Sequence, residues 1–460
     1  MPYTVSDIHG TADVLSVAAT VAAGSNGAMS ELLKRHQAVM PSWLALFYDE
    51  PLEIVSGSGR RVTGADGRTY LDFFAGILTN ALGYDVAEIS DAVRRQVDTG
   101  VLHTSTLYLI RQQVELAERI AELSGIPGAK VFFTNSGTEA NEAALMLSTQ
   151  ARRSNQVLAL RNSYHGRAFG TVGITGNRGW SASSLSPVNV SYVHGGYRYR
   201  SPFRDLDDAA YIDACVDDLR NIIETTTAGD VACMIAEPIQ GVGGFATPPD
   251  GLFAGFKQVL DQYGILLVSD EVQTGWGRTG THFWGMSAHG VTPDAMTFAK
   301  GLGNGLAIGG VVARGDLMDS LTANSISTFG GNPVATAGAA AVIEYVLGHD
   351  LQANSRKQGD RMLAALRELQ DKYDVVGDVR GKGLMIGVEL VEPGSNAPST
   401  RAASSVLEKT RTAGLLVGKG GLYGNVIRLA PPMTLTDDET DEGLQILTEA
   451  ITTTHQELTA

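Results

Sequence analysis

The stretch ILLVSDEVQTG, residues 265–275, contains the pattern from which the fold can be deduced. Its first five residues are too apolar to be anything but a buried strand. Two carboxylates, Asp270 and Glu271, follow at the carboxyl end of that strand. Because an unpaired buried carboxylate is strongly unfavourable or becomes neutral, a charge at this place needs a cationic partner.

Short apolar runs of the same kind recur along the middle of the chain and alternate with amphipathic stretches. Apolar residues recur with a helical period after Gly137 and again before Gly264, which lies where a helix C-cap belongs. We expect strands at residues 131–134, 157–160, 231–236, 265–269, 295–299 and 308–313. This alternation is typical of an α/β fold with a mostly parallel sheet covered by helices.

The composition changes near the GGNP sequence at residues 330–333, and the Ala-rich stretch after it predicts one connecting helix at 334–347. Beyond this helix, apolar runs at 375–390 and 415–429 predict strands of a second, smaller α+β domain. The first part of the chain has one expected strand, at 68–72, and no helix–strand repetition. We therefore predict three parts: an N-terminal segment of the small domain at 1–85, a large domain at 86–330, and the connecting helix with the small domain at 331–460.

Composition narrows the range of functions. Of the 460 residues, 43% are hydrophobic and 18% are charged, which is typical of a globular protein and not of a disordered one. The formal charge of -15 disfavours nucleic acid and anionic membranes as partners. No apolar run is long enough to span a membrane, and the apolar segment at 14–29 has no basic residue before it. We therefore expect a cytoplasmic protein without a signal or transit peptide.

The cysteines and histidines give no sign of a metal site. Cys215 and Cys233 form no CxxC motif, so we expect two buried structural thiols and no disulfide framework. The histidines outside the motifs described below show no ligand spacing. We predict no metal.

The sequence NSGTEANE, residues 135–142, follows an expected strand and begins an expected helix. The backbone N–H groups of Gly137 and Thr138 then lie at the positive end of the helix dipole, which suits a phosphate. The same residues also fit an ordinary helix start, with Ser136 or Thr138 as the N-cap. The turn alone does not decide between these interpretations.

A lysine follows the expected strand at 295–299. Lys300 lies beside glycines in the sequence TFAKGLG, residues 297–303. A buried lysine is as unfavourable as a buried carboxylate, and its usual functional use is as a Schiff-base amine. Lys300 and Asp270 could instead form a structural ion pair with each other.

The phosphate-type turn, Asp270 and Lys300 all follow strands of the predicted parallel sheet. Ligands of such sheets bind beyond the carboxyl ends of the strands. An anion site, a carboxylate and an amine are what pyridoxal 5′-phosphate requires for its phosphate, its pyridine nitrogen and its aldehyde. A carboxylate within about 4 to 6 Å would keep the ring nitrogen protonated, so that the ring accepts electrons.

Six motifs together resemble those of the class-III, fold-type-I pyridoxal-phosphate-dependent aminotransferases, and the resemblance extends over residues 51–449. The motifs are NSGTEANEAAL (135–145), SYHGR (163–167), AEPIQGVGG (236–244), SDEVQTGWGRTG (269–280), TFAKGLGNG (297–305) and STFGGNP (327–333). The resemblance implies a fold-type-I transferase whose large domain binds the cofactor and whose small domain comes from the chain ends.

The resemblance also implies residue roles. Lys300 would be the imine lysine and Asp270 the partner of the pyridine nitrogen, and these two are the implied catalytic residues. Ser136, Gly137 and Thr138 would form the phosphate site. The remaining implied contacts are Tyr164 stacked on the ring, Val272 behind it, Gln273 at the phenolic oxygen, and Thr328 at the phosphate of the neighbouring subunit. This last role requires a homodimer.

Three residues concern the substrate. Arg167 occupies the position that clamps a substrate carboxylate in the 4-aminobutyrate and acetylornithine members, although it could also be a structural arginine. Glu237 and Arg428 match the family's switch pair, in which the glutamate masks the arginine from ω-amines and releases it for an α-carboxylate. A permanent buried salt bridge is the alternative for this pair.

Four other stretches resemble the alanine–glyoxylate and 3-aminoisobutyrate–pyruvate branch of the family. They lie at residues 70–77, 103–106, 196–200 and 416–421. That branch often has a small residue where this chain has Arg167, so the chain departs from it there.

The resemblance implies a ping-pong transfer of an amino group, through a Lys300 Schiff base, from an ω-amino acid or related amine to a keto acid. Pyruvate, glyoxylate and 2-oxoglutarate are the expected acceptors. The expected assembly is a homodimer with shared active sites, which could pair into a tetramer. The alternatives are another reaction on the same scaffold, namely that of an amino-acid racemase, a decarboxylase or an amine-phosphate lyase, or a non-catalytic binding protein.

Overall fold

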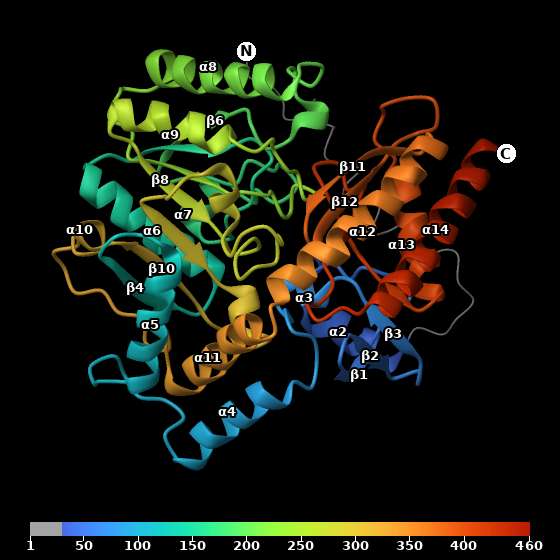
Figure 1. Ribbon diagram of the computed structural model, residues 1–460, viewed down its shortest axis with the longest axis horizontal. Helices are drawn as coiled ribbons and strands as arrows, with labels where there is room; N and C mark the ends of the chain where they lie inside the picture. The colour runs from blue at the N-terminus through green and yellow to red at the C-terminus, as the bar shows by residue number, and fades with distance from the viewer. Residues whose placement is uncertain (1–29) are drawn as a thin grey trace, which may run out of the picture. The chain divides into compact units, whose positions relative to one another are not determined.

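A computed structural model describes residues 30–460 of the chain (Figure 1). The chain divides into two units, Met1–Glu53 and Ile54–Ala460. In the first unit, Ser30 caps helix α2 (Glu31–Val39) by accepting a hydrogen bond from the backbone N–H of Leu33 at 3.1 Å. The apolar segment at 14–29, and with it the beginning of the predicted 1–85 segment, lies outside the described residues.

A seven-stranded sheet forms the centre of the second unit. Its spatial order is β4-β10-β9-β8-β7-β5-β6, and every neighbouring pair is parallel except the two that involve β10. The strands are β4 (Ala129–Thr134), β5 (Gln156–Leu160), β6 (Asn189–Val193), β7 (Cys233–Ala236), β8 (Leu266–Asp270), β9 (Ala295–Phe298) and β10 (Gly309–Arg314). The predicted mostly parallel sheet is confirmed.

Two strands differ from the expectation. The short connection between β9 and β10, residues 299–308, has no room for the crossover that a parallel neighbour needs, so β10 runs antiparallel. The edge strand β6 was not predicted because its sequence, NVSYV, is less apolar than the others and only its last residue is buried.

Helices cover both faces of this sheet (Figure 1). On one face, Leu158 and Met234 pack with α8 (Asp208–Thr226) and α9 (Leu252–Tyr263) in one apolar cluster. On the other, their neighbours Val157 and Cys233 pack with α6 (Gly137–Arg152), as the two-residue period of a strand requires. Further helices of this part are α4 (Ala87–Asp98), α5 (Arg111–Ser124), α7 (Phe169–Gly173), α10 (Gly315–Met318) and the predicted connecting helix α11 (Pro333–Gly348).

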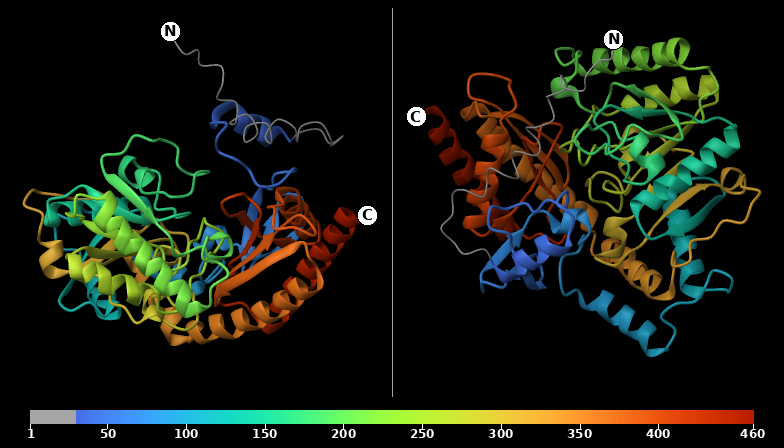
Figure 2. Two further views of the ribbon diagram at one scale, coloured as in Figure 1. Left: turned by 90° about the horizontal axis from the view of Figure 1, so that it is seen from above. Right: turned by 180° about the vertical axis from the view of Figure 1, so that it is seen from behind.

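The C-terminal part forms a four-stranded sheet in the order β11-β12-β15-β14. Its strands are β11 (Val376–Lys382), β12 (Met385–Leu390), β14 (Gly418–Gly420) and β15 (Val426–Leu429). Three helices accompany it: α12 (Leu351–Lys372), α13 (Thr400–Thr412) and α14 (Asp437–Thr459). Helix α14 packs against both α12 and α13 (Figure 2).

A third sheet joins distant parts of the second unit. Its order is β1-β2-β3-β13, with β1 (Ile54–Ser58), β2 (Arg61–Gly64), β3 (Thr69–Asp72) and β13 (Leu415–Leu416). The expected strand at 68–72 is β3, and it pairs in parallel with β13 from the C-terminal part. After β3 the chain makes the short turn α3 (Ala75–Leu78). The boundaries at 85/86 and 330/331 stay predictions.

Both cysteines are free thiols in the apolar core. Burial raises the pKa of each thiol to about 12, which makes them structural and unreactive. Among residues 30–460, none of the helices combines the length and apolarity needed to cross a membrane.

Candidate active site

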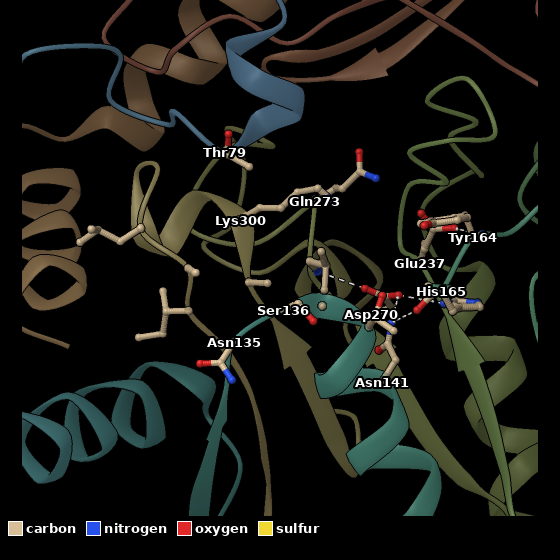
Figure 3. A pocket seen from close by; sticks show the side chains of 18 of the residues that line it. Thr79, Asn135, Ser136, Asn141, Tyr164, His165, Glu237, Asp270, Gln273 and Lys300 are labelled. Carbon is tan, nitrogen blue, oxygen red and sulfur yellow. Dashed lines mark hydrogen bonds and ion pairs between the residues drawn. The ribbon is translucent and has the colours of Figure 1, made fainter. Parts of the chain in front are cut away.

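A cavity of about 380 Å³ lies at the edge of the large sheet where the parallel strands end (Figure 3). Asp270 is the last residue of β8, Lys300 follows β9, and α6 begins just after β4. The predicted cofactor residues that line this cavity are Ser136, Gly137, Thr138, Tyr164, Asp270, Val272, Gln273 and Lys300. Glu237, which follows β7, lines it as well.

The start of α6 serves both as an ordinary capped helix and as an anion site. The hydroxyl of Ser136 accepts a hydrogen bond from the backbone N–H of Glu139 at 3.2 Å. The N–H groups of Gly137 and Thr138 have no carbonyl acceptor within the helix, because they lie in its first turn. A Cβ atom at Gly137 would lie 2.9 Å from both methyl groups of Val272, so only glycine lets Val272 pack against this turn.

Asp270 is 4% exposed and is held by three donors. Its Oδ2 atom accepts a hydrogen bond from Asn141 Nδ2 at 2.7 Å and pairs with His165 Nδ1 at 2.8 Å. Its Oδ1 atom accepts one from the backbone N–H of Val272 at 3.1 Å. The roles of Asn141 and His165 were not predicted, although both residues lie inside quoted motifs.

Lys300 occupies a strained position. Its φ of +44° lies in the left-handed region, which a residue other than glycine adopts only at a cost of roughly 1–2 kcal/mol. Its Nζ atom makes no hydrogen bond or salt bridge with any described residue, so the alternative of an ion pair with Asp270 does not hold. Burial lowers the pKa of the Lys300 ammonium; the charges of Asp270 and Glu237 oppose this, and that of Arg428 adds to it.

Glu237 and Arg428 approach each other without a direct salt bridge. Glu237 Oε1 accepts from the backbone N–H of Tyr164, and Oε2 accepts from that of Gly241, both at 2.8 Å. Arg428 Nη1 donates instead to the carbonyl oxygen of Gly241 at 3.1 Å. The guanidinium also lies over the ring of Phe74, 4.9 Å from its centroid. The alternative of a permanent salt bridge between the two side chains therefore does not hold.

Burial is also the main influence on the acidity of this pair. Glu237 is 3% exposed, and its burial raises the pKa to about 7. Burial lowers the pKa of Arg428 to about 10. Both shifts mean that the protein holds these groups in a place that disfavours charge.

Three predicted residues do not line the cavity, namely the buried Arg428 described above and two exposed residues. Arg167 and Thr328 are exposed, Arg167 just after the cavity residue Gly166 and Thr328 in the segment between α10 and α11. Their roles stay predictions.

The residues that line the cavity fit pyridoxal 5′-phosphate. The amide oxygen of Gln273 is buried without a hydrogen-bond partner, as is expected of a side chain that faces a polar ligand. Tyr164 provides an aromatic ring, held edge-on by Trp180 with 5.5 Å between the ring centroids. Together with the helix start, the buried acid and the unpaired amine, these groups define a pyridoxal-phosphate-dependent transferase.

Comparison with known proteins identifies the family. The model of the class-III aminotransferases matches residues 48–451, and the chain belongs to this family. It is 38% identical over 414 residues to "Alanine--glyoxylate aminotransferase 2 homolog 2, mitochondrial" of Arabidopsis thaliana, with 89% of this chain and 84% of that protein covered. The protein is a class-III aminotransferase, and its cofactor is pyridoxal phosphate.

Other relatives carry different names. The 5-aminovalerate aminotransferase DavT of Pseudomonas putida is 36% identical, with 91% of this chain and 97% of DavT covered. An alanine/serine racemase of Pyrococcus horikoshii is 33% identical, with 92% of this chain and 90% of the racemase covered. Among solved structures, an amine transaminase from an uncultivated Pseudomonas species has a TM-score of 0.84 at 32% identity, with 90% of this chain and 98% of that chain covered.

Proposed function

We propose that this aminotransferase moves an amino group from an ω-amino acid or related amine to pyruvate, glyoxylate or 2-oxoglutarate. The two half-reactions share one lysine, Lys300, in ping-pong order. The observation that carries the proposal is the amine of Lys300, which lies in one cavity with Asp270 and the start of α6 and makes no hydrogen bond or salt bridge with residues 30–460. An amine without a permanent partner is available to react and to carry protons.

Pyridoxal phosphate, when bound, supplies an aldehyde that reacts with amines and a ring that accepts electrons. Three sets of residues would hold it. Ser136, Gly137 and Thr138 would bind the phosphate with the helix dipole behind them. Asp270 would hold a proton on the ring nitrogen, while Val272 and Tyr164 would confine the ring.

Lys300 moves the proton in this proposal. Because burial lowers its pKa, a larger share of the Nζ amine is neutral near pH 7 than for an exposed lysine. A neutral amine can take a proton from the substrate carbon that carries the amino group, and it can donate that proton to the aldehyde carbon of the cofactor. The same Nζ atom would bond to the aldehyde carbon of the cofactor when no substrate is present.

The substitution Lys300→Ala tests this assignment. We expect the variant to retain pyridoxal phosphate through the phosphate site but to lose turnover. The measurement is consumption of the keto-acid acceptor, for each of the three acceptors, with beta-alanine, 4-aminobutyrate, acetylornithine or alanine as the donor. Normal turnover in the variant would refute the role of Lys300.

The same donor–acceptor matrix separates the main alternative. A relative at 33% identity is named a racemase, so a reaction that needs no acceptor is the second candidate. A racemase inverts an amino acid without consuming a keto acid, and a decarboxylase or lyase releases carbon dioxide or phosphate. Stoichiometric consumption of the keto acid favours transamination over all three.

Arg167 is the proposed clamp for the distal carboxylate of the donor. Its support is its place next to Gly166 in the cavity wall and its charge, which lowers the pKa of the neighbouring Tyr164 and opposes the increase due to burial. We expect Arg167→Ala to lose activity with carboxylate-bearing ω-amino donors and to retain it with simple amines. Equal losses in both donor classes count against the clamp.

We further propose a homodimer in which Thr328 reaches the phosphate in the partner subunit. Thr328 lies between two exposed apolar side chains, Ile326 at 58% and Phe329 at 59% exposure, and the exposed apolar segment Leu107 to Leu109 supplies a second apolar surface. Mixing Lys300→Ala with Thr328→Ala tests the proposal, because a mixed dimer contains one complete site. Recovery of activity on mixing supports a shared site, and light scattering gives the number of subunits.

The location in the cell stays a proposal as well. The predicted cytoplasmic location is to be weighed against the relative from Arabidopsis thaliana, which is mitochondrial by name. Cell fractionation followed by immunodetection of the full chain tests it.

A further inference from the structure

Asn141 connects the three elements that carry the cofactor-binding groups. It lies on α6, one turn after the phosphate turn, and is 1% exposed. Its Nδ2 atom donates to Asp270 Oδ2 on β8 at 2.7 Å and to the backbone carbonyl of His165 at 2.8 Å. Its Oδ1 atom accepts from the hydroxyl of Thr297 on β9 at 2.6 Å. Figure 3 shows Asn141 beside Asp270 and His165.

The orientation of the Asn141 amide is fixed by its partners. The carbonyl oxygen of His165 can only accept a hydrogen bond, so the NH2 group of Asn141 must face it. The Oδ1 atom then faces Thr297, whose hydroxyl must donate. All three polar positions of the amide are therefore occupied in only one way.

Thr297 extends this connection to the lysine. It pairs directly with Asp270 across the β8–β9 ladder and lies three residues before Lys300 on the same strand end. Thr297 is fully buried, and so the hydrogen bond to Asn141 forms without competition from water. The acid strand, the lysine strand and the phosphate helix thus meet at one amide.

We propose that Asn141, held by Thr297, is a positioning residue that fixes the Asp270 carboxylate for the pyridine nitrogen of the cofactor. This inference rests on the role of Asp270 in the proposed function. With Oδ2 occupied by Asn141 and His165, Oδ1 accepts only from the Val272 N–H and retains a lone pair. A carboxylate that is fixed in advance binds the protonated ring nitrogen without reorganising.

The test compares pyridoxal 5′-phosphate with its 1-deaza analogue, which has carbon in place of the ring nitrogen. Dissociation constants are measured by equilibrium dialysis on the full chain and on Asn141→Leu. We expect the substitution to raise the dissociation constant of pyridoxal 5′-phosphate about 10- to 100-fold, which is the effect of losing a hydrogen bond to a charged group. The dissociation constant of the analogue should change less than about threefold, because the analogue has no protonated ring nitrogen to pair with Asp270.

A second pair of variants guards against a failure of Asn141→Leu to fold. Thr297→Val removes the hydroxyl and keeps the shape, while Thr297→Ser keeps the hydroxyl. We expect Thr297→Val to raise the dissociation constant of pyridoxal 5′-phosphate about three- to tenfold and to leave that of the analogue unchanged. Thr297→Ser should bind pyridoxal 5′-phosphate as the unaltered chain does. Ser148→Ala, a buried change on the same helix whose hydroxyl donates to Ala144, is the matched control and should alter neither constant.

The outcomes separate this inference from the proposed function. Equal losses for both compounds in Asn141→Leu and Thr297→Val mean a purely structural role and overturn the inference. If the unaltered chain binds both compounds equally, Asp270 does not act at the ring nitrogen, and the proposed role of Asp270 fails together with the inference. A loss confined to pyridoxal 5′-phosphate supports both.

Discussion

Two regions of the molecule bury charged side chains and treat them in opposite ways. One is the cavity at the edge of the large sheet. The other is the contact between residues 196–200 and the C-terminal sheet, where Glu389 of β12 is fully buried. Glu389 accepts hydrogen bonds from Arg380 Nη1 at 2.8 Å, Arg200 Nε at 2.7 Å and the hydroxyl of Tyr197 at 2.6 and 2.7 Å.

The acidity of the buried groups reflects this difference. Burial alone would raise the pKa of Glu389, but Arg380, Tyr197 and Arg200 together hold it below its usual value. Glu237 in the cavity has two backbone N–H donors and no cation in direct contact, and burial raises its pKa. A charge that is fully paired stabilises one structure, whereas a charge left short of partners is available for chemistry.

Glu389→Ala gives the largest expected loss of stability. It leaves the buried guanidinium of Arg380 with only the carboxylate of Asp378 and the partly exposed guanidinium of Arg200 without a carboxylate. Breaking a buried cluster on one side costs about 3–5 kcal/mol. The free energy of unfolding in urea measures the loss. Glu389→Gln, which keeps an acceptor oxygen, should lose less. An unchanged urea midpoint in Glu389→Ala would remove the contrast between the two regions.

The sequence predicted the cavity better than it predicted this ion cluster. Asp270 and Lys300 each end an apolar strand, so their burial and their common edge follow from local pattern and sheet geometry. Arg380 and Glu389 lie within expected strands, but the local sequence does not show their partners, because Arg200 is brought to them from far along the chain. Only the tertiary structure pairs them.

The same limit applies inside the cavity. The sequence placed NSGTEANE at a helix start, but it could not assign the amide of Asn141 to Asp270, 129 residues away. The antiparallel direction of β10 follows from the short connection after β9 and was open to prediction; the unpredicted strand β6 has too weak an apolar pattern.

Glu237→Gln tests the cavity side of the comparison through pH. In the unfolded chain this carboxyl ionises near 4.5, and in the folded protein near 7. Between these values the folded state binds more protons, so its stability falls as pH rises, with a slope of up to roughly 1.4 kcal/mol per pH unit. Glu237→Gln should remove that slope. Parallel stability–pH curves of the two proteins between pH 4.5 and 7 would contradict the raised pKa.

Lys300→Met should change the free energy of unfolding in the opposite direction to Glu389→Ala. It replaces an amine that lines the cavity without hydrogen-bond partners by an apolar side chain of similar length, so we expect the cofactor-free protein to gain about 1 kcal/mol. Turnover is lost, as for Lys300→Ala. The control is Lys357→Met, because Lys357 is 60% exposed and pairs with Asp437 at the surface. A decrease in stability at Lys300 similar to that at Glu389 would show that both regions are built for stability alone.

Arg200→Lys gives a small expected loss of stability and tests how much of the stability of the ion cluster depends on its geometry. Arg200 donates through Nε to Glu389 and through Nη1 to the carbonyl of Asn396 at 2.8 Å. A lysine ammonium cannot span both acceptors, yet Arg380 still neutralises Glu389, so the loss should be about 1 kcal/mol.

Arg204→Lys, at an arginine that is 52% exposed and 3.5 Å from Asp205, should change the urea midpoint little. Combining Arg200→Lys with Glu389→Gln completes a double-mutant cycle. A strictly additive result would mean that the two side chains are buried together without stabilising each other, and Glu389 would then resemble Glu237 more than its hydrogen bonds suggest.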